Sequence, residues 1–124
     1  MRPSQNMRPS QFEAFAEMVE AISPHSIIEA LEWEIPILEK LRAYPRPAPS
    51  ADAESILHFA KFVVAARREM PVEFSAAALP SQHHDFYGKT VARLVNAEEL
   101  PFTAIAKFDD LVCNDHLKAA NHTA

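Results

Sequence analysis

ADAESILHFAKFVVAARREM, residues 51–70, is the stretch that decides the fold we predict for this chain. Apolar side chains fill most of its positions and fall on nearly every side of a helix, and Pro71 ends it. The one polar stripe consists of Glu54, His58, Lys61 and Arg68. A helix that is apolar almost all round is normally surrounded by other helices, because only they can cover its whole surface. We therefore expect the helix over about 51–70 to be the centre of a bundle.

Segments with helical spacing flank this central helix, and prolines separate them. Ser10 and Glu13 fit a capping box at the start of a helix over about 11–22, and Ser23–Pro24 begins the next helix. Pro36 lies inside this second helix, where we expect a kink or a break. A short helical turn at 74–79 and helices over about 81–99 and 101–120 follow. The sequence therefore predicts an all-α fold, a compact bundle of about five helices with proline-punctuated connections.

Two details of this organisation stay open at the level of sequence. Phe102, Ala104, Ala106 and Phe108 alternate, so a short strand over 102–108 is the alternative to a helix there. Residues 1–9 include most of a repeated MRPSQ sequence, and we expect them to form a flexible N-terminal tail. We expect residues 10–124 to form a single helical domain.

The composition restricts both the location and the chemistry of the protein. The 124 residues carry a formal net charge of −5 and include one glycine, ten prolines and one cysteine. A lone cysteine cannot form an intrachain disulfide, the N-terminus lacks the apolar segment of a signal peptide, and no apolar run could span a bilayer. We therefore expect a cytoplasmic protein that does not bind membranes. Glycine-rich nucleotide motifs are absent, and we expect no cofactor.

The predicted second helix carries more apolar side chains than one small core needs. Trp33, Ile37 and Tyr44 form a second apolar edge beside the edge that faces the core. Exposed aromatic patches usually mark surfaces at which proteins bind partners. Our leading hypothesis is a non-enzymatic helical interaction or regulatory module. We expect it to self-associate as a dimer, or to bind a protein partner, through these three side chains.

A second hypothesis is a helix-turn-helix DNA-binding regulator that uses residues 74–99. Gln82, Lys89 and Arg93 share one face of the predicted 81–99 helix, and such side chains bind bases or phosphates. Asp85 and the pair Glu98–Glu99 nevertheless leave this helix net negative, whereas phosphate binding normally needs neighbouring bases. Nucleic acid is therefore an alternative partner that we do not favour.

A third hypothesis places a small-molecule or metal site near His84 and Gly88. Glycine in the middle of a helix costs about 1 kcal/mol relative to alanine, so Gly88 calls for a reason. A close crossing with another helix is our first interpretation, and a kink beside a ligand pocket is the second. The six histidines show no metal-binding spacing such as H-E-x-x-H, and no residue is assigned as a metal ligand or as catalytic. An enzyme with an unrecognised site is a further alternative that nothing in the sequence favours.

Overall fold

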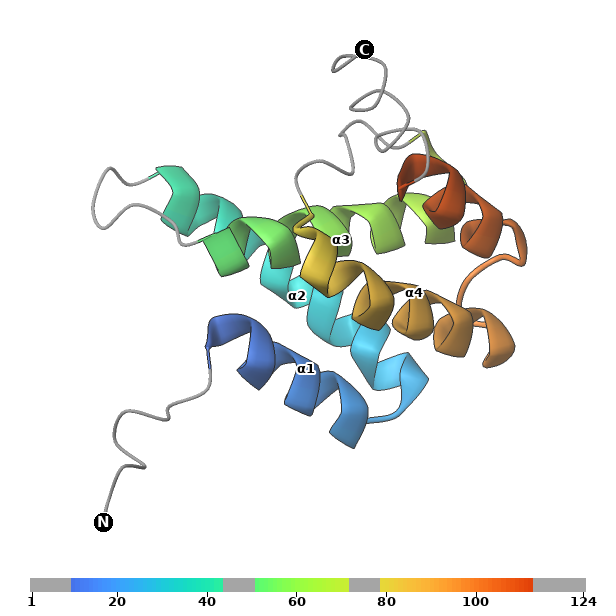
Figure 1. The fold of residues 1–124 in the computed structure, drawn as a ribbon, viewed down its shortest axis with the longest axis horizontal. Coiled ribbons are helices and arrows are strands. Elements are labelled where there is room, and N and C mark those ends of the chain that lie inside the picture. Colours follow the sequence, from blue (N-terminus) through green and yellow to red (C-terminus); the bar gives the residue numbers. More distant parts are fainter. Residues whose placement is uncertain (1–9, 44–50, 72–78, 113–124) are drawn as a thin grey trace.

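The computed structural model describes residues 10–43, 51–71 and 79–112. Within these ranges the chain forms five helices and no strand, which confirms the predicted all-α fold. The helices are α1 (Gln11–Ala21), α2 (Pro24–Ala43), α3 (Ala51–Arg67), α4 (Ser81–Asn96) and a helix over 103–112. Figure 1 shows α3 crossing the bundle, with α2 behind it, α4 in front and the 103–112 helix near its C-terminal end.

The helix α3 is the most deeply buried element, as its sequence predicts. Its most extensive contact is with α2, and it also packs against α1. It contributes the following buried apolar side chains: Ile56, Leu57, Phe59, Ala60, Phe62, Val63 and Ala66. The other helices also contribute buried side chains to the core. These are Phe15 and Val19 of α1; Ile27, Ile28, Leu31 and Leu38 of α2; Tyr87, Val91 and Leu94 of α4; and Ala104 and Phe108 of the 103–112 helix. These side chains form one continuous core under all five helices.

Serine side chains begin the first two helices. The Ser10 hydroxyl accepts a hydrogen bond from the Glu13 N–H at 3.1 Å, and the Ser10 N–H donates to the Glu13 carboxylate at 2.8 Å. The predicted capping box is therefore confirmed. At α2, the Ser26 N–H donates to the Ser23 hydroxyl at 3.2 Å, and Pro24 takes the first helical position. Proline fits there because the N–H that it lacks would have no partner inside the helix.

Two helices end in the same way, on a glutamate in the left-handed backbone region. Glu69 follows α3 with a φ of 55°, and Glu98 follows α4 with a φ of 64°. In each case the N–H of the glutamate and the N–H of the following residue donate to the last helical carbonyls. Glu69 donates to Ala66 at 3.1 Å and Met70 to Ala65 at 2.8 Å, and Glu98 donates to Val95 at 2.9 Å and Glu99 to Leu94 at 2.8 Å. This is the Schellman arrangement, which normally uses glycine. It ends α3 and α4 three residues before the predicted ends at 70 and 99.

The structure decides two local expectations, at Pro36 and at 102–108. The break at Pro36 is wrong, because α2 runs from Pro24 to Ala43, whereas the alternative of a kink there stays a prediction. The strand alternative at 102–108 is wrong, because residues 103–112 are helical. Ala104 and Phe108 point into the core at helical spacing, and the Phe108 ring meets Phe62 edge-on with ring centroids 5.4 Å apart.

Several predictions fall on residues outside the described ranges. These are the tail over 1–9, the turn at 74–79 apart from Leu79, and the end of the predicted last helix beyond residue 112. The single-domain prediction for 10–124 is untested for the same reason.

Candidate functional site

The outward face of α2 carries exposed apolar side chains. Trp33 is 74% exposed and Ile37 is 49% exposed, although both belong to residue types that are usually covered. Leu31 and Leu38 point the opposite way and are buried against the core. The helical repeat thus divides α2 into one side that holds the fold together and one apolar surface that the described part of the chain leaves open. Tyr44, the third residue of the predicted edge, lies outside the described residues.

Pro36 shapes this surface. A proline inside a helix has no N–H to donate to the carbonyl four residues earlier, which here belongs to Glu32. A shallow hollow of about 260 Å³ lies at this position, lined by Glu29, Glu32, Trp33 and Pro36. The exposed indole therefore borders a recess beside this proline. A partner could fill this recess with an apolar side chain.

The charges around this surface are unevenly distributed along α2. Glu29 and Glu32 lie on its N-terminal side, and Lys40 is exposed on its C-terminal side. Glu39 forms an ion pair with Lys61 of α3 at 2.9 Å, so it belongs to the α2–α3 contact. The imidazole of His25 lies 3.6 Å from the Glu29 carboxylate, and both groups are well exposed. The apolar surface therefore has an acidic end and a basic end.

The residues of the predicted nucleic-acid face do not act as one set. Gln82 and Lys89 are exposed, and the Lys89 ammonium lies 3.1 Å from Asp85. The Arg93 guanidinium instead points toward α1, where it donates to the carbonyl oxygens of Val19 at 2.9 Å and Ile22 at 2.5 Å. Arg93 thus binds the last carbonyls of another helix, and such carbonyls have no hydrogen-bond donor within their own helix. Its side chain is committed to the fold.

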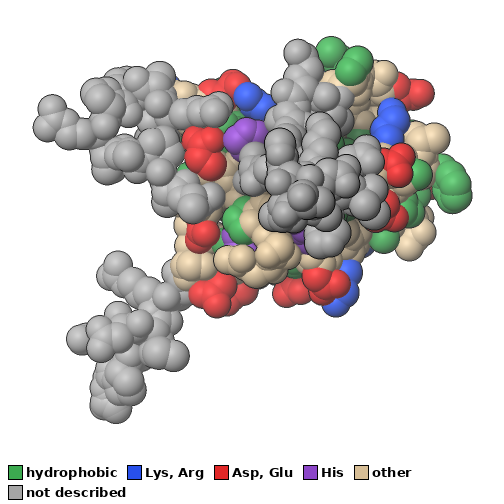
Figure 2. Space-filling view, turned by 45° about the horizontal axis from the view of Figure 1, so that its top comes forward, with side chains coloured by type: hydrophobic (Ala, Val, Ile, Leu, Met, Phe, Trp, Pro, Cys, Tyr) green, Lys and Arg blue, Asp and Glu red, His purple; other side chains and the backbone are tan. Residues whose placement is uncertain are grey.

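The described residues visible in Figure 2 show Asp and Glu side chains interspersed with Lys and Arg side chains, and no extended basic area is seen among them on this face. A phosphate backbone needs a basic footprint. The first helix of the predicted helix-turn-helix falls mostly on residues outside the described ranges, so that motif stays a prediction.

The predicted pocket residues have ordinary structural partners. His84 donates from Nε2 to the carbonyl oxygen of Leu79 at 2.7 Å, just before its own helix begins. A Cβ atom placed on Gly88 would lie 3.7 Å from the Phe108 ring, which is normal van der Waals contact. Gly88 thus lies beside the 103–112 helix, but this contact does not require a glycine. The 103–112 helix approaches through the Phe108 side chain, which leaves room for a methyl group.

A hydrogen-bonded chain of buried polar groups was missed by sequence reasoning. The Ser55 hydroxyl lies 3.0 Å from Nδ1 of His83 and 2.6 Å from the Tyr87 hydroxyl, and all three residues are buried. The His83 ring stacks on Phe12 of α1 with ring centroids 3.5 Å apart. The Phe12 N–H donates to the Asp52 carboxylate at 2.8 Å. These contacts connect α1, α3 and α4. The available signal was a histidine and a tyrosine four residues apart on the apolar face of α4.

The chemistry of this buried chain is structural. Burial lowers the pKa of His83, although the Asp52 carboxylate acts in the opposite direction. Burial also raises the pKa of Tyr87, so its hydroxyl stays protonated. A serine beside a histidine is a pattern of nucleophilic catalysis, but the Ser55 hydroxyl is completely enclosed and no substrate can reach it in this state. Such a buried hydrogen-bonded network instead favours one packing of the core.

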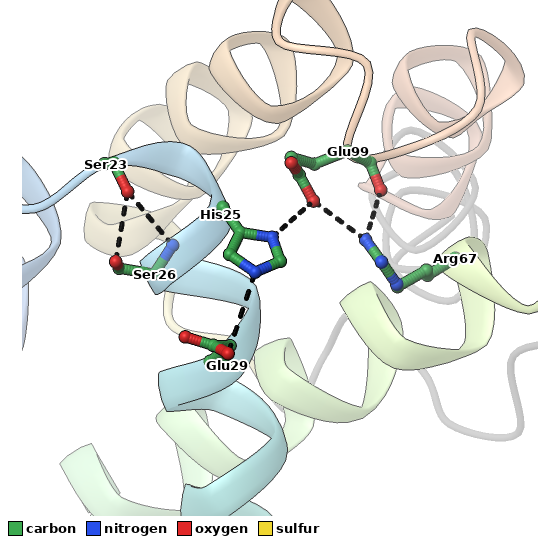
Figure 3. Close-up of polar contacts among 6 residues, drawn as sticks. All are labelled: Ser23, His25, Ser26, Glu29, Arg67 and Glu99. Atoms are coloured by element: carbon green, nitrogen blue, oxygen red, sulfur yellow. Dashed lines mark hydrogen bonds and ion pairs between the residues drawn. The ribbon is translucent and has the colours of Figure 1, made fainter.

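An ionic cluster joins three parts of the chain on the surface. Arg67 at the end of α3 donates to both the backbone carbonyl and the carboxylate of Glu99, each at 3.0 Å. Figure 3 shows the His25 ring reaching the same carboxylate from the first turn of α2, at 3.5 Å. The hydrogen bond from Arg67 lowers the pKa of Glu99, and His25 adds to this effect. A shallow hollow of about 550 Å³ lies beside the cluster, lined in part by Arg67, Glu99 and Phe102.

The described part of the chain contains no group of three or more His, Cys, Asp or Glu side chains that could hold a metal ion. None of its helices has both the length and the apolar character that crossing a membrane would require. Comparison of the sequence and the structure with protein-family models, with curated proteins and with solved structures finds no match.

Proposed function

We propose that the protein is a non-enzymatic helical interaction module that binds another protein surface through the outward face of α2. The observation that carries the proposal is the exposure of Trp33, at 74%, next to the half-exposed Ile37. The energetic reason is that covering a large apolar side chain contributes about 1.5–3 kcal/mol. Tryptophan is also enriched among the few residues that dominate the binding energy of interfaces.

Single exposed apolar residues are common on monomeric proteins, so the arrangement matters more than the count. Trp33, Pro36 and Ile37 lie within two turns of one helix, and the first two border the same hollow. A continuous apolar surface with a recess and a charged rim is the usual anatomy of a protein interface. A cytoplasmic location, which the lone cysteine favours, is part of this proposal.

The proposal is tested with three tagged baits in extracts of the cells that produce the protein. The baits are the native chain, Trp33→Glu and, as a matched control, Phe102→Glu, since Phe102 is 83% exposed on a different part of the molecule. We expect at least one protein, which can be a second copy of this chain, to bind the native and Phe102→Glu baits and to be lost from Trp33→Glu. Binding that depends on neither aromatic side chain, or on both equally, contradicts the proposal.

A further inference from the structure

Four exposed residues form one stripe along the outward face of α2. Glu29, Trp33, Pro36 and Lys40 are all exposed, and they follow one another at intervals of four, three and four residues. Residues three and four apart lie one above the other on a helix, so the four side chains share a line along the helix axis. The stripe therefore reads acidic, apolar, apolar, basic from its N-terminal end to its C-terminal end.

This order is self-complementary when two copies of the stripe lie antiparallel. A two-fold axis between Trp33 and Pro36 places Trp33 against the partner's Pro36 and Glu29 against the partner's Lys40. Symmetry repeats both contacts, so the two apolar residues meet in the middle and an ion pair forms at each end. A parallel pairing would instead place like charges on each other at both ends, which is unfavourable.

We infer that the occupant of the α2 face is a second copy of this chain, bound through an antiparallel, two-fold symmetric contact between the two α2 helices. The inference rests on the proposed function, because it names the partner of the same surface. It assigns Glu29 and Lys40, which sequence reasoning did not select, as the residues that set the register. Ile37 extends the apolar contact beside Trp33, and Glu39 stays on its own chain with Lys61.

The contact has modest strength for physical reasons. One pair of crossing helices buries less surface than a standard protein interface, and exposed ion pairs add little affinity. The charges mainly decide which arrangement is adopted, since a wrong register brings like charges together. We therefore expect a reversible dimer with a dissociation constant in the micromolar range.

Charge reversal at the two ends of the stripe tests the arrangement. The variants are Glu29→Lys, Lys40→Glu and the double variant, with Glu17→Lys as the matched control on the exposed side of α1. The dissociation constants come from sedimentation equilibrium at low ionic strength, where charges are least screened. The emission of Trp33, the only tryptophan, reports burial of the indole on the same samples.

Each single reversal should weaken the dimer by about tenfold, because it replaces two symmetric attractions by two repulsions. The double variant restores opposite charges across the axis and should return close to the native value, while Glu17→Lys has no effect. If the two single effects add in the double variant, or if neither has an effect, the antiparallel register is wrong.

The failure of this inference is distinguishable from failure of the proposed function. A native chain that stays monomeric, while another protein still binds in a Trp33-dependent way, overturns the second copy as occupant and leaves the interaction module standing. If no protein, including a second copy, depends on Trp33, both proposals fail.

Discussion

Glu98 holds a backbone conformation that glycine adopts more easily. Glu98 follows the end of α4 with a φ of 64°, and Glu69 follows the end of α3 with a φ of 55°. A non-glycine residue in the left-handed region destabilises the folded state by about 1–2 kcal/mol. A glycine avoids this strain, but its greater conformational freedom in the unfolded chain offsets part of the gain. The chain contains one glycine and uses it elsewhere, so both helix ends retain this cost.

Replacing either of these glutamates by glycine should stabilise the protein. We expect Glu98→Gly to raise the free energy of unfolding by about 0.5–1 kcal/mol, measured by urea denaturation. Glu17→Gly, in the middle of α1 on its exposed side, serves as the control and should lower the free energy of unfolding by about 1 kcal/mol. A loss of stability in Glu98→Gly would show that the left-handed turn is not the reason for the strain.

Replacing the single glycine, Gly88, by alanine should also stabilise the protein. Among the described residues, a Cβ atom at Gly88 meets only the Phe108 ring, at an ordinary 3.7 Å, so Gly88→Ala should raise the free energy of unfolding by up to about 1 kcal/mol. The same denaturation series measures it. Destabilisation would mean that Phe108 cannot accept the extra methyl group and that the crossing is as tight as the sequence led us to expect.

At the scale of elements, Arg93 of α4 forms hydrogen bonds with the C-terminal end of α1. Its guanidinium donates to the carbonyls of Val19 and Ile22, at the end of α1. Hydrogen bonds from a charged group contribute about 1.5–3 kcal/mol, so Arg93→Ala should lower the free energy of unfolding by about that amount. Lys89→Ala is the comparison, since its exposed ion pair with Asp85 contributes about 0.5 kcal/mol or less. Equal effects of the two substitutions would contradict this structural role of Arg93.

The buried His83 should make the stability of the fold depend on pH. Burial lowers the pKa of His83 below the 6.5 of the free side chain, so the unfolded chain binds a proton at a pH where the folded chain does not. Stability is therefore complete above about pH 6.5 and falls as the pH drops toward the lower pKa of the folded state. The pKa of Glu99 is lowered from 4.5, so its contribution is lost only below that pH.

Melting temperatures between about pH 7.5 and 5 should show the His83 effect alone, because Glu99 acts only below pH 4.5. We expect the native protein to lose stability below about pH 6.5, and His83→Gln, which keeps a hydrogen-bonding group near Ser55, to have a flatter profile in this range. An unchanged slope in His83→Gln would assign the acid sensitivity to another group.

Sequence reasoning found the elements whose signals are local. The sequence signals for a buried α3 and for the Ser10–Glu13 capping box come from residues close together in the chain, and both features are present as predicted. The ends of α3 and α4 were placed too late, because a left-handed Glu69 or Glu98 carries no glycine signal. The interhelical contacts of Arg93 and His83 join residues far apart in the chain, and no pattern in a single sequence indicates such pairs.

At the scale of the whole molecule, the α2 face was predicted only in part, because a single sequence does not show contacts between distant residues. Helical periodicity alone places Trp33 and Ile37 opposite the core side of α2, and both are exposed in the structure. The stripe from Glu29 to Lys40 became visible only when the exposure of each residue and the Glu39–Lys61 ion pair were known. Their role in binding is a prediction that follows from this arrangement.

The solution mass of the purified chain tests the central claim most directly. Light scattering on a sizing column, run over a range of concentrations and at two salt concentrations, compares the native chain with Trp33→Glu. We predict a native mass that approaches twice the 13.9 kDa of one chain at high concentration and returns to 13.9 kDa on dilution. Trp33→Glu should stay at 13.9 kDa throughout. A native chain of constant 13.9 kDa, or a dimer that survives Trp33→Glu, would contradict the account.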